Sequence, residues 1–361
     1  MASPVRAGRR GSVRLKQVFI EEYCVTDLKT AGRVIGIDLA RCAALISMFI
    51  AHGAPGGGPG GVLNLSEFLT APLFAFLLGA GAFFSSQRMS FPALFASSVV
   101  RAIALVAVGL YIGTWGAQVD IVLEYLGLLS LLMAPLVFLP SWALALLAVG
   151  SWWFAASARL HFRPQAMQAS LDGSYTAYLY EWMFTGQNYQ VFTLLTYACI
   201  GAVIAFLIER WGVWGDVALA LLGSLATGGL FWYSRFAVAE FLPYTSSRLE
   251  IAFSLAACLA TVGWCCLLAR ALAGREHLAG ALVGAGRMTL SLYVLQIAVL
   301  ALYANYAPAY GLPVSDNSWA MMFGLILGAL LFAWAWQRLL GQTFLWRGPL
   351  ETPLAWISGR G

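Results

Sequence analysis

Charge is what this sequence has least of. Only 10% of its 361 residues are Asp, Glu, Lys or Arg, while 61% are hydrophobic. Soluble globular chains carry about 25% charged residues. A mean hydropathy of +0.79 therefore excludes an ordinary soluble domain and places most of the chain in lipid. The net charge of +5, without any run of basic and aromatic residues, argues against a nucleic-acid partner.

Metal-ligand spacings, internal repeats and a cleavable signal are also missing. We expect the six cysteines, mostly within apolar runs, to be small buried side chains rather than zinc ligands or disulfides. A transporter built from two similar halves would show a repeat. A polar stretch separates the basic N-terminus from the first apolar run, unlike a cleaved signal. Residues 1–33 are expected to be a retained cytoplasmic tail, either an amphipathic helix on the membrane surface or a solvated segment.

Apolar runs are plentiful, and a span needs roughly 20 mostly apolar residues. Such runs occur at about 34–52, 67–86, 93–115, 119–139, 141–157, 190–209, 215–236, 249–272, 286–305 and 317–340. The breaks between them fall at glycine, proline or charge, for example at Arg210–Trp211–Gly212. The sequence therefore predicts an all-α, polytopic integral membrane helix bundle with about ten transmembrane helices.

The distribution of Lys and Arg orients this bundle, because basic residues resist translocation. With the N-terminus in the cytoplasm, sixteen basic residues lie inside and four outside. Both termini are then cytoplasmic. We expect a transmembrane domain over 34–345, a cytoplasmic C-terminal tail over 346–361, and an outer loop over 158–189 that is polar and aromatic. This loop either covers an outward-facing site or is an ordinary long connection.

The first apolar run, "GIDLARCAALISMFIAHG" at 36–53, holds three ionisable residues. Arg41 and His52 are eleven residues apart, which puts them on one helix face about 16 Å apart along the axis. Asp38 is three residues before Arg41, within pairing distance. Ionisable groups within a membrane normally face a protein interior or a water-filled cavity. Asp38 is expected to form an ion pair with Arg41. His52 is either a catalytic residue or a histidine that lies at the membrane interface at the end of the helix.

An arginine and a histidine separated by ten residues resemble the Arg-x10-His motif of the acyltransferase-3 family. The surrounding "IDLARCAALISMFIAH" also resembles the opening of heparan-α-glucosaminide N-acetyltransferase and its relatives. More of the chain is similar to the YeiB-type (DUF418-like) branch of bacterial membrane proteins. The elements that carry this similarity are "PLFAFLLGAGAFF" at 72–84, "DIVLEYLGLL" at 120–129, "GRMTLSLYVLQ" at 286–296 and "RGPLE" at 347–351. The YeiB-type branch often has Asn at the position of His52.

This resemblance implies a multi-pass protein of the bacterial inner membrane that transfers an acyl group, most simply acetyl, from cytoplasmic acyl-CoA. The acceptor would be a hydroxyl or amine of an envelope glycan or lipid on the outer side. An imidazole has its ordinary pKa near neutral pH, which would suit His52 to the role of general base. Arg41 can hold a carbonyl oxygen or oxyanion, with Asp38 orienting it. No metal is expected. The chain either works with membrane lipids alone or joins a homo-oligomer or a partner protein.

Other charged residues are placed by the expected topology. Acceptor-side candidates are Asp120, Glu124 and Glu67 at the outer ends of helices, where one of the first two either orients His52 or simply faces water at a helix N-terminus. Cytoplasmic cations for the CoA phosphates are Arg287, Arg88, Arg101 and Arg347, each of which is alternatively a positive-inside anchor. The polar side chains of the run at 286–305 either line a substrate tunnel or form hydrogen bonds between helices. They are Thr289, Ser291, Tyr293 and Gln296.

Two other functions fit the composition. A carrier or flippase would move a substrate without bond chemistry, and a non-catalytic subunit of an envelope complex would tolerate loss of His52. The missing repeat argues against the carrier. The pairing of Arg41 and His52 on one helix favours the acyltransferase.

Overall fold

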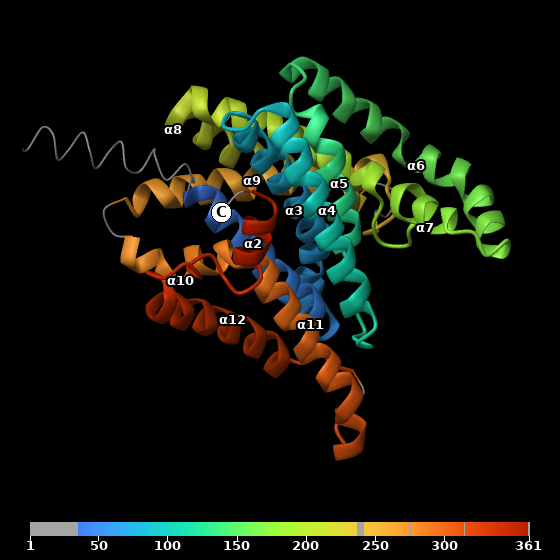
Figure 1. The fold of residues 1–361 in the computed structure, drawn as a ribbon, viewed down its shortest axis with the longest axis vertical. Coiled ribbons are helices and arrows are strands. Elements are labelled where there is room, and N and C mark those ends of the chain that lie inside the picture. Colours follow the sequence, from blue (N-terminus) through green and yellow to red (C-terminus); the bar gives the residue numbers. More distant parts are fainter. Residues whose placement is uncertain (1–34, 237–241, 274–275, 314, 360–361) are drawn as a thin grey trace, which may run out of the picture. The chain divides into compact units, whose positions relative to one another are not determined.

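A computed structural model describes residues 35–236, 242–273, 276–313 and 315–359. The predicted tail at 1–33, including its amphipathic-helix alternative, lies outside these residues. Within the described parts, the regular structure is helical throughout, as the apolar runs predicted. Figure 1 shows the helices packed along one another, with α6 and α7 beside the rest of the bundle.

The helices follow the predicted apolar runs closely. Long helices are α2 (Ile35–Gly53), α3 (Leu65–Ser86), α4 (Phe91–Gly113), α6 (Ser141–Leu171), α8 (Val191–Phe236), α9 (Arg248–Ala271), α11 (Thr289–Tyr306) and α12 (Trp319–Leu340). Shorter elements are α5 (Leu123–Leu136), α7 (Thr176–Tyr180), α10 (Glu276–Arg287), α13 (Glu351–Ile357), a π-helical turn η3 (Glu181–Thr185), and the 3-10 turns η1 (Pro55–Gly57), η2 (Pro59–Asn64) and η4 (Ala307–Tyr310). Eight helical stretches in the described chain are long and apolar enough to cross a membrane, and α5 is a shorter apolar helix.

The eight stretches agree with ten predicted runs because α5 matches the run at 119–139 and α8 contains two of the others. The 46 residues of α8 would extend for about 69 Å as one straight helix, more than twice the hydrocarbon thickness of about 30 Å. Gly212 interrupts it with φ 57° and ψ −139°, a conformation that glycine adopts without a Cβ clash. The predicted break at this glycine is confirmed, and α8 provides two successive crossings.

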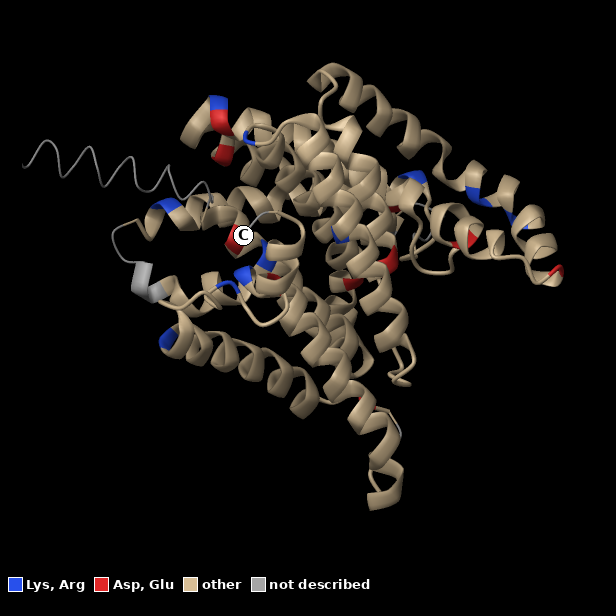
Figure 2. Ribbon diagram, viewed as in Figure 1, with Lys and Arg blue, Asp and Glu red and all other residues tan. Residues whose placement is uncertain are grey.

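The expected outer loop at 158–189 is mostly helical instead. Helix α6 starts at Ser141 as predicted but continues to Leu171, and α7 and η3 follow it. The low hydropathy of this segment suggested a loop, although a helix needs an apolar surface only where it meets lipid or protein. The exposed Arg163 lies on the extended part of α6, and Figure 2 shows Lys and Arg residues along it.

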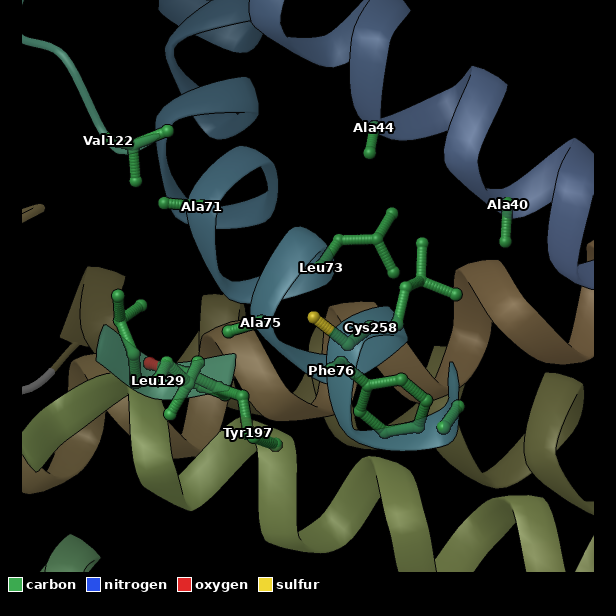
Figure 3. Packing of buried hydrophobic residues seen from close by; sticks show 14 of the residues in the cluster. Ala40, Ala44, Ala71, Leu73, Ala75, Phe76, Val122, Leu129, Tyr197 and Cys258 are labelled. Carbon is green, nitrogen blue, oxygen red and sulfur yellow. The ribbon is translucent and has the colours of Figure 1, made fainter. Parts of the chain in front are cut away.

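The core forms where small residues let helices approach closely. Figure 3 shows Ala40 and Ala44 of α2 near Leu73 and Phe76 of α3, with Tyr197 of α8 on the other side. A Cβ on Gly79 of α3 would stand 1.8 Å from the carbonyl oxygen of Ala198 on α8, so only glycine allows this contact. Small residues serve membrane helices in this way because lipid offers no hydrophobic force between them.

The bundle has an inner and an outer end. The inner end contains the start of α2, the turn between α3 and α4, α10 and α13, and the outer end contains His52 and the start of α3. These names follow the orientation that the basic residues predict, which stays a prediction. Charged residues are sparse along the helices (Figure 2).

Candidate active site

At the inner end of α2, one buried carboxylate holds two guanidinium groups. Asp38 is fully buried. Its Oδ1 accepts a hydrogen bond from Arg41 Nη1 at 2.8 Å, and its Oδ2 accepts one from Arg287 Nε at 3.4 Å. The predicted pairing of Asp38 with Arg41 is confirmed. Buried charges are stable only when they are paired in this way.

Helix α10 reaches Asp38 because it ends in glycine next to Arg287. A Cβ on Gly286 would stand 1.8 Å from the Asp38 carbonyl oxygen. Glycine at this position therefore lets the α10 backbone touch α2 and delivers Arg287 to the carboxylate. Arg287 was predicted to bind the donor, and the structure places it in this ion pair beside the indole ring of Trp346, 5.9 Å from the ring centroid.

The C-terminal segment closes over the same end. Glu351 of α13 accepts hydrogen bonds from the backbone N–H of Ser291 at 2.9 Å and from its hydroxyl at 2.5 Å. Arg347 lies over Trp346 at 5.2 Å. Burial raises the pKa of the Glu351 carboxyl above its ordinary value. The elements "GRMTLSLYVLQ" and "RGPLE", which are far apart in sequence, thus form one contact.

A cavity of about 220 Å³ runs along the inner half of the bundle between α2, α3, α4, α5 and α11. We call it the central cavity. Its polar or charged lining consists of Arg41, Ser85, Ser98, Arg101, Ser130, Thr289 and Tyr293. The remaining lining is mostly leucine, phenylalanine, valine and alanine. The Arg41 guanidinium crosses the face of Gly81 on α3, where a Cβ would lie 3.7 Å from Nη2. Two guanidinium groups and several hydroxyls therefore share the cavity wall with apolar side chains.

The predicted donor-side cations separate into three groups. Arg101 lines the central cavity together with Arg41. Arg287 and Arg347 pack on Trp346 and are not among the residues that line the cavity. Arg88 is exposed in the turn after α3. Only Arg101 of these four cations lines the central cavity.

At the outer end of α2, His52 meets a neutral partner. Its Nδ1 lies 2.8 Å from Nε2 of Gln296 on α11. Gln296 is almost fully buried, and its Oε1 has no hydrogen-bond partner among the described residues. The imidazole is thus oriented by Gln296 and not by Asp120 or Glu124, the two carboxylates that the sequence offered for this role.

The amide of Gln296 decides which ring nitrogen of His52 carries the proton. With the amide nitrogen toward the ring, Nδ1 accepts and Nε2 holds the hydrogen. With the amide turned over, Nδ1–H donates to Oε1 and leaves a lone pair on Nε2. The O and N of an amide are assigned from the hydrogen-bond network. The second arrangement gives the imidazole form with a lone pair on Nε2, which a general base requires.

The three acceptor-side carboxylates have different surroundings. Glu124 of α5 is buried against α4, where a Cβ on Gly109 would stand 2.7 Å from its Cδ. Asp120 is exposed and accepts a hydrogen bond from the Asn188 side chain. Glu67 is partly exposed in the first turn of α3. The described residues show no ion pair to any of the three carboxylates.

Helix α11 connects the two ends of the site. Thr289 and Tyr293 line the central cavity, and the Tyr293 hydroxyl accepts a hydrogen bond from the Val122 N–H at 3.2 Å. Ser291 binds Glu351, and Gln296 binds His52. Thr289 and Tyr293 thus line the cavity, whereas Ser291, Gln296 and also Tyr293 form hydrogen bonds to other elements. The partnership of Gln296 with His52 had no signal in the sequence beyond a polar residue in an apolar helix.

Arg41 and His52 are on one helix, but their side chains lie toward opposite ends of it. Their separation along α2 is about 16 Å. Arg41 bends toward Asp38 at the start of the helix, which is away from His52. The central cavity is lined by Arg41 and not by His52. The arrangement offers a cationic channel toward the inner end and a histidine toward the outer end.

Comparison with protein families agrees with these features. A family model described as "Acyltransferase domain", that of acyltransferase-3, matches residues 34–337. A comparison with curated proteins gives no match. The matched range includes α2 with Arg41 and His52 and continues to the last turn of α12. The chain belongs to this family of membrane acyltransferases.

Proposed function

We propose that this multi-pass member of the acyltransferase-3 family transfers an acyl group, most simply acetyl, from cytoplasmic acyl-CoA to an acceptor on the other side of the membrane. The acceptor is a hydroxyl or amine of an envelope glycan or lipid. The observation that carries the proposal is the central cavity, which combines two guanidinium groups with hydroxyl and apolar side chains.

The central cavity suits the donor because acyl-CoA has a charged end and a long, weakly polar arm. Guanidinium groups bind phosphates through parallel hydrogen bonds and stay charged in apolar surroundings. Arg41 and Arg101 are placed to receive these phosphates, and the apolar residues beyond them accommodate the arm. Tyr293, whose hydroxyl binds the Val122 N–H just before α5, would then face the part of the donor that carries the thioester.

Arg41 is assigned to the donor's phosphates and not to the reacting carbonyl. Its guanidinium is held toward Asp38, on the side of the helix start. A carbonyl oxygen within hydrogen-bond distance of His52 would be too far from it. This assignment replaces the role as oxyanion holder that the motif first suggested, and it keeps Asp38 as the residue that positions Arg41.

His52 acts on the acceptor in this proposal. The acceptor O–H or N–H gives its proton to Nε2 as the acceptor atom attacks the thioester carbon. The carbon–sulfur bond then breaks, and the departing thiolate takes the proton. Gln296 holds Nδ1 at 2.8 Å, which fixes the ring during both steps. A positioned base of this kind contributes about 10²- to 10⁴-fold to a rate.

Two finer assignments belong to the same proposal. The contact between the 286–296 and 347–351 elements supports the YeiB-type branch, because both elements resemble that branch and Glu351 joins them. A bacterial inner membrane is then the expected location. The remaining acceptor-side carboxylates, Asp120 and Glu67, are available to accept hydrogen bonds from acceptor hydroxyls.

The test is transfer of radiolabel by the purified chain in nanodiscs. Labelled acetyl-CoA is supplied with an extract of envelope glycans and lipids, and wild type is compared with His52→Ala. His161→Ala is the matched control, because His161 is an exposed histidine of α6. We expect labelled product from wild type and His161→Ala and none from His52→Ala.

Two results would contradict the proposal. Equal product from His52→Ala would remove the histidine from the chemistry. No product from any variant, together with no saturable binding of acetyl-CoA, would favour a carrier or a subunit of an envelope complex. Loss of binding in Arg101→Gln would separately locate the donor in the central cavity.

A further inference from the structure

Helix α6 is longer than a membrane crossing requires. Its 31 residues extend for about 46 Å, and the hydrocarbon layer is about 30 Å thick. Arg159 and Arg163 lie about 27 and 33 Å from the start of the helix. The two arginines therefore reach the outer boundary of the membrane, on the side where basic residues are disfavoured.

These arginines line a second cavity, which we call the outer pocket. Its volume is about 630 Å³. The lining residues are Ala156, Arg159, Leu160, Arg163, Thr185, Gln187, Tyr244 and Thr245. They come from α6, the end of η3 and the connections before α8 and α9. Three separate parts of the chain thus converge on two cations.

Arg159 holds the walls of the outer pocket in place. Its Nη1 donates to the carbonyl oxygen of Tyr244 at 2.7 Å, and its Nη2 donates to that of Gln187 at 3.0 Å. The nearby Glu250 acts on Arg159 through space, and among the described residues the two form no ion pair: this carboxylate accepts from the Tyr244 N–H at 2.8 Å and from the Thr245 hydroxyl at 2.9 Å. The positive charge of Arg159 is therefore bound to carbonyl dipoles and not to a carboxylate.

Arg163 lines the same cavity with its donors available. It lies one turn after Arg159 on the same helix face, and like charges at this spacing repel. Among the residues that the structure describes, no hydrogen bond or ion pair involves Arg163, and no carboxylate forms an ion pair with Arg159. A cavity whose described lining holds two neighbouring guanidinium groups and no carboxylate is complementary to an anion.

The backbone beside the pocket is strained at two residues with side chains. Tyr244 has a φ of 66° and Ser246 a φ of 57°, which is a costly conformation for residues with side chains. Arg159 and Glu250 hold the carbonyl and the N–H of Tyr244. Such over-determined strain is concentrated at ligand sites.

A row of tyrosines leads from the outer pocket toward the central cavity. The rings of Tyr244 and Tyr189 have centroids 5.7 Å apart, and those of Tyr189 and Tyr125 are also 5.7 Å apart. Tyr125 is two residues after Leu123, which lines the central cavity. The three packed rings therefore connect the wall of the outer pocket with the wall of the central cavity.

We propose that the outer pocket binds a phosphate group of the acceptor, with Arg163 as the main contact and Arg159 as the second. The identification of the ligand as the acceptor rests on the proposed function. The existence of the anion site does not depend on that function. The phosphate can belong to a lipid head group or to a soluble phosphorylated sugar, and the same pair of guanidinium groups recognises both.

The experiment measures binding without turnover. The purified full chain is kept in dodecyl maltoside micelles, which contain no phosphate, and its thermal unfolding is followed with added glucose 1-phosphate or phosphatidylglycerol. Glucose and diacylglycerol are the uncharged counterparts. A ligand that binds only the folded chain raises the unfolding temperature in proportion to its affinity. We expect a phosphate probe to raise it and the uncharged counterparts to leave it unchanged.

Arg163→Gln is the decisive variant, and Arg210→Gln is its control at the opposite end, where Arg210 is exposed on α8. Loss of a charge-assisted contact should weaken phosphate binding about tenfold to a hundredfold in Arg163→Gln and not in Arg210→Gln. Arg163→Lys should keep part of the affinity, because lysine keeps the charge but lacks the planar guanidinium group that donates two parallel hydrogen bonds.

The two probes identify the source of the phosphate. A response to phosphatidylglycerol alone assigns a lipid head group, and a response to glucose 1-phosphate assigns a soluble sugar. No response to either probe, an equal response to the uncharged counterparts, or unchanged affinity in Arg163→Gln would overturn the site. Acyl transfer is not measured, so failure of the proposed transferase activity would leave this result intact and distinguishable.

Discussion

The two ends of helix α2 hold their ionisable residues in opposite ways. At the inner end, Asp38 is fully buried and is paired with Arg41 and Arg287. At the outer end, His52 contacts the neutral amide of Gln296. The first arrangement fixes charges that cost several kcal/mol to separate. The second orients the imidazole through a neutral hydrogen-bond partner and pairs no charge with it.

In the proposed mechanism, this difference separates a structural ion pair from a reacting group within the 19 residues of α2. Asp38 places Arg41 at the central cavity and ties α10 to α2, so its removal should affect the folded state first. His52 has a single hydrogen-bonded neighbour, so its removal should affect the reaction first. Substitutions at each end can test this division.

The largest effect is expected for His52→Gln. Glutamine can keep a hydrogen bond to Gln296 but cannot act as a base near neutral pH. We expect kcat for acyl transfer to fall about 10²- to 10⁴-fold with little change in the unfolding temperature. Steady-state kinetics and thermal unfolding of the same preparation measure both. A fall in stability equal to that of an Asp38 variant would remove the distinction between the two ends.

Asp38→Ala should instead be mainly a stability variant. It leaves the guanidinium groups of Arg41 and Arg287 without their shared carboxylate, and breaking a buried pair costs about 3–5 kcal/mol. Denaturation in mild detergent should detect this loss. Asp216→Ala is the matched control, since Asp216 is also buried but pairs with Arg270 alone, and its effect should be smaller. The reverse order would show that the two-arginine arrangement adds nothing.

Gln296→Leu tests the neutral partner at the outer end. Leucine has a similar size but cannot hydrogen-bond the imidazole, so the ring is no longer held in one orientation. We expect kcat to fall about tenfold, corresponding to the loss of one hydrogen bond of about 1 kcal/mol or slightly more, with the KM for the donor unchanged. Gln296→Asn, which is too short to reach, should behave like Gln296→Leu. Unaltered kcat in both variants would show that Gln296 does not position His52.

The smallest effect is expected at Glu351, which closes the inner end. Burial raises the pKa of this carboxyl above 4.5, so the folded chain binds the proton more tightly than the unfolded chain. Stability should therefore decrease as pH rises above about 4.5, through the raised pKa of the folded state. Glu351→Gln should remove this decrease. Unfolding temperatures between pH 4 and 8 measure it, and an identical profile for Glu351→Gln would contradict the assignment.

Several elements could be predicted because their causes are local. Apolar runs of about 20 residues gave the positions of the crossings, and Gly212 marked the break within α8. The pairing of Asp38 with Arg41 follows from a three-residue spacing on a helix. The expectation of an outer loop at 158–189 was wrong, because the low hydropathy of α6 beyond Ser157 reflects its exposure and not a lack of helix.

The sequence by itself determined that this is a helical membrane protein and which residues share the polar face of α2, since hydropathy and helical periodicity are properties of neighbouring residues. Only the tertiary structure decided the partners across the bundle. Arg287 joins Asp38 across 249 residues, and Gln296 joins His52 across 244. The outer pocket similarly needs α6 beside the segments around Gln187 and Tyr244. Such contacts depend on how glycine and alanine faces let whole helices approach, and no local pattern encodes that.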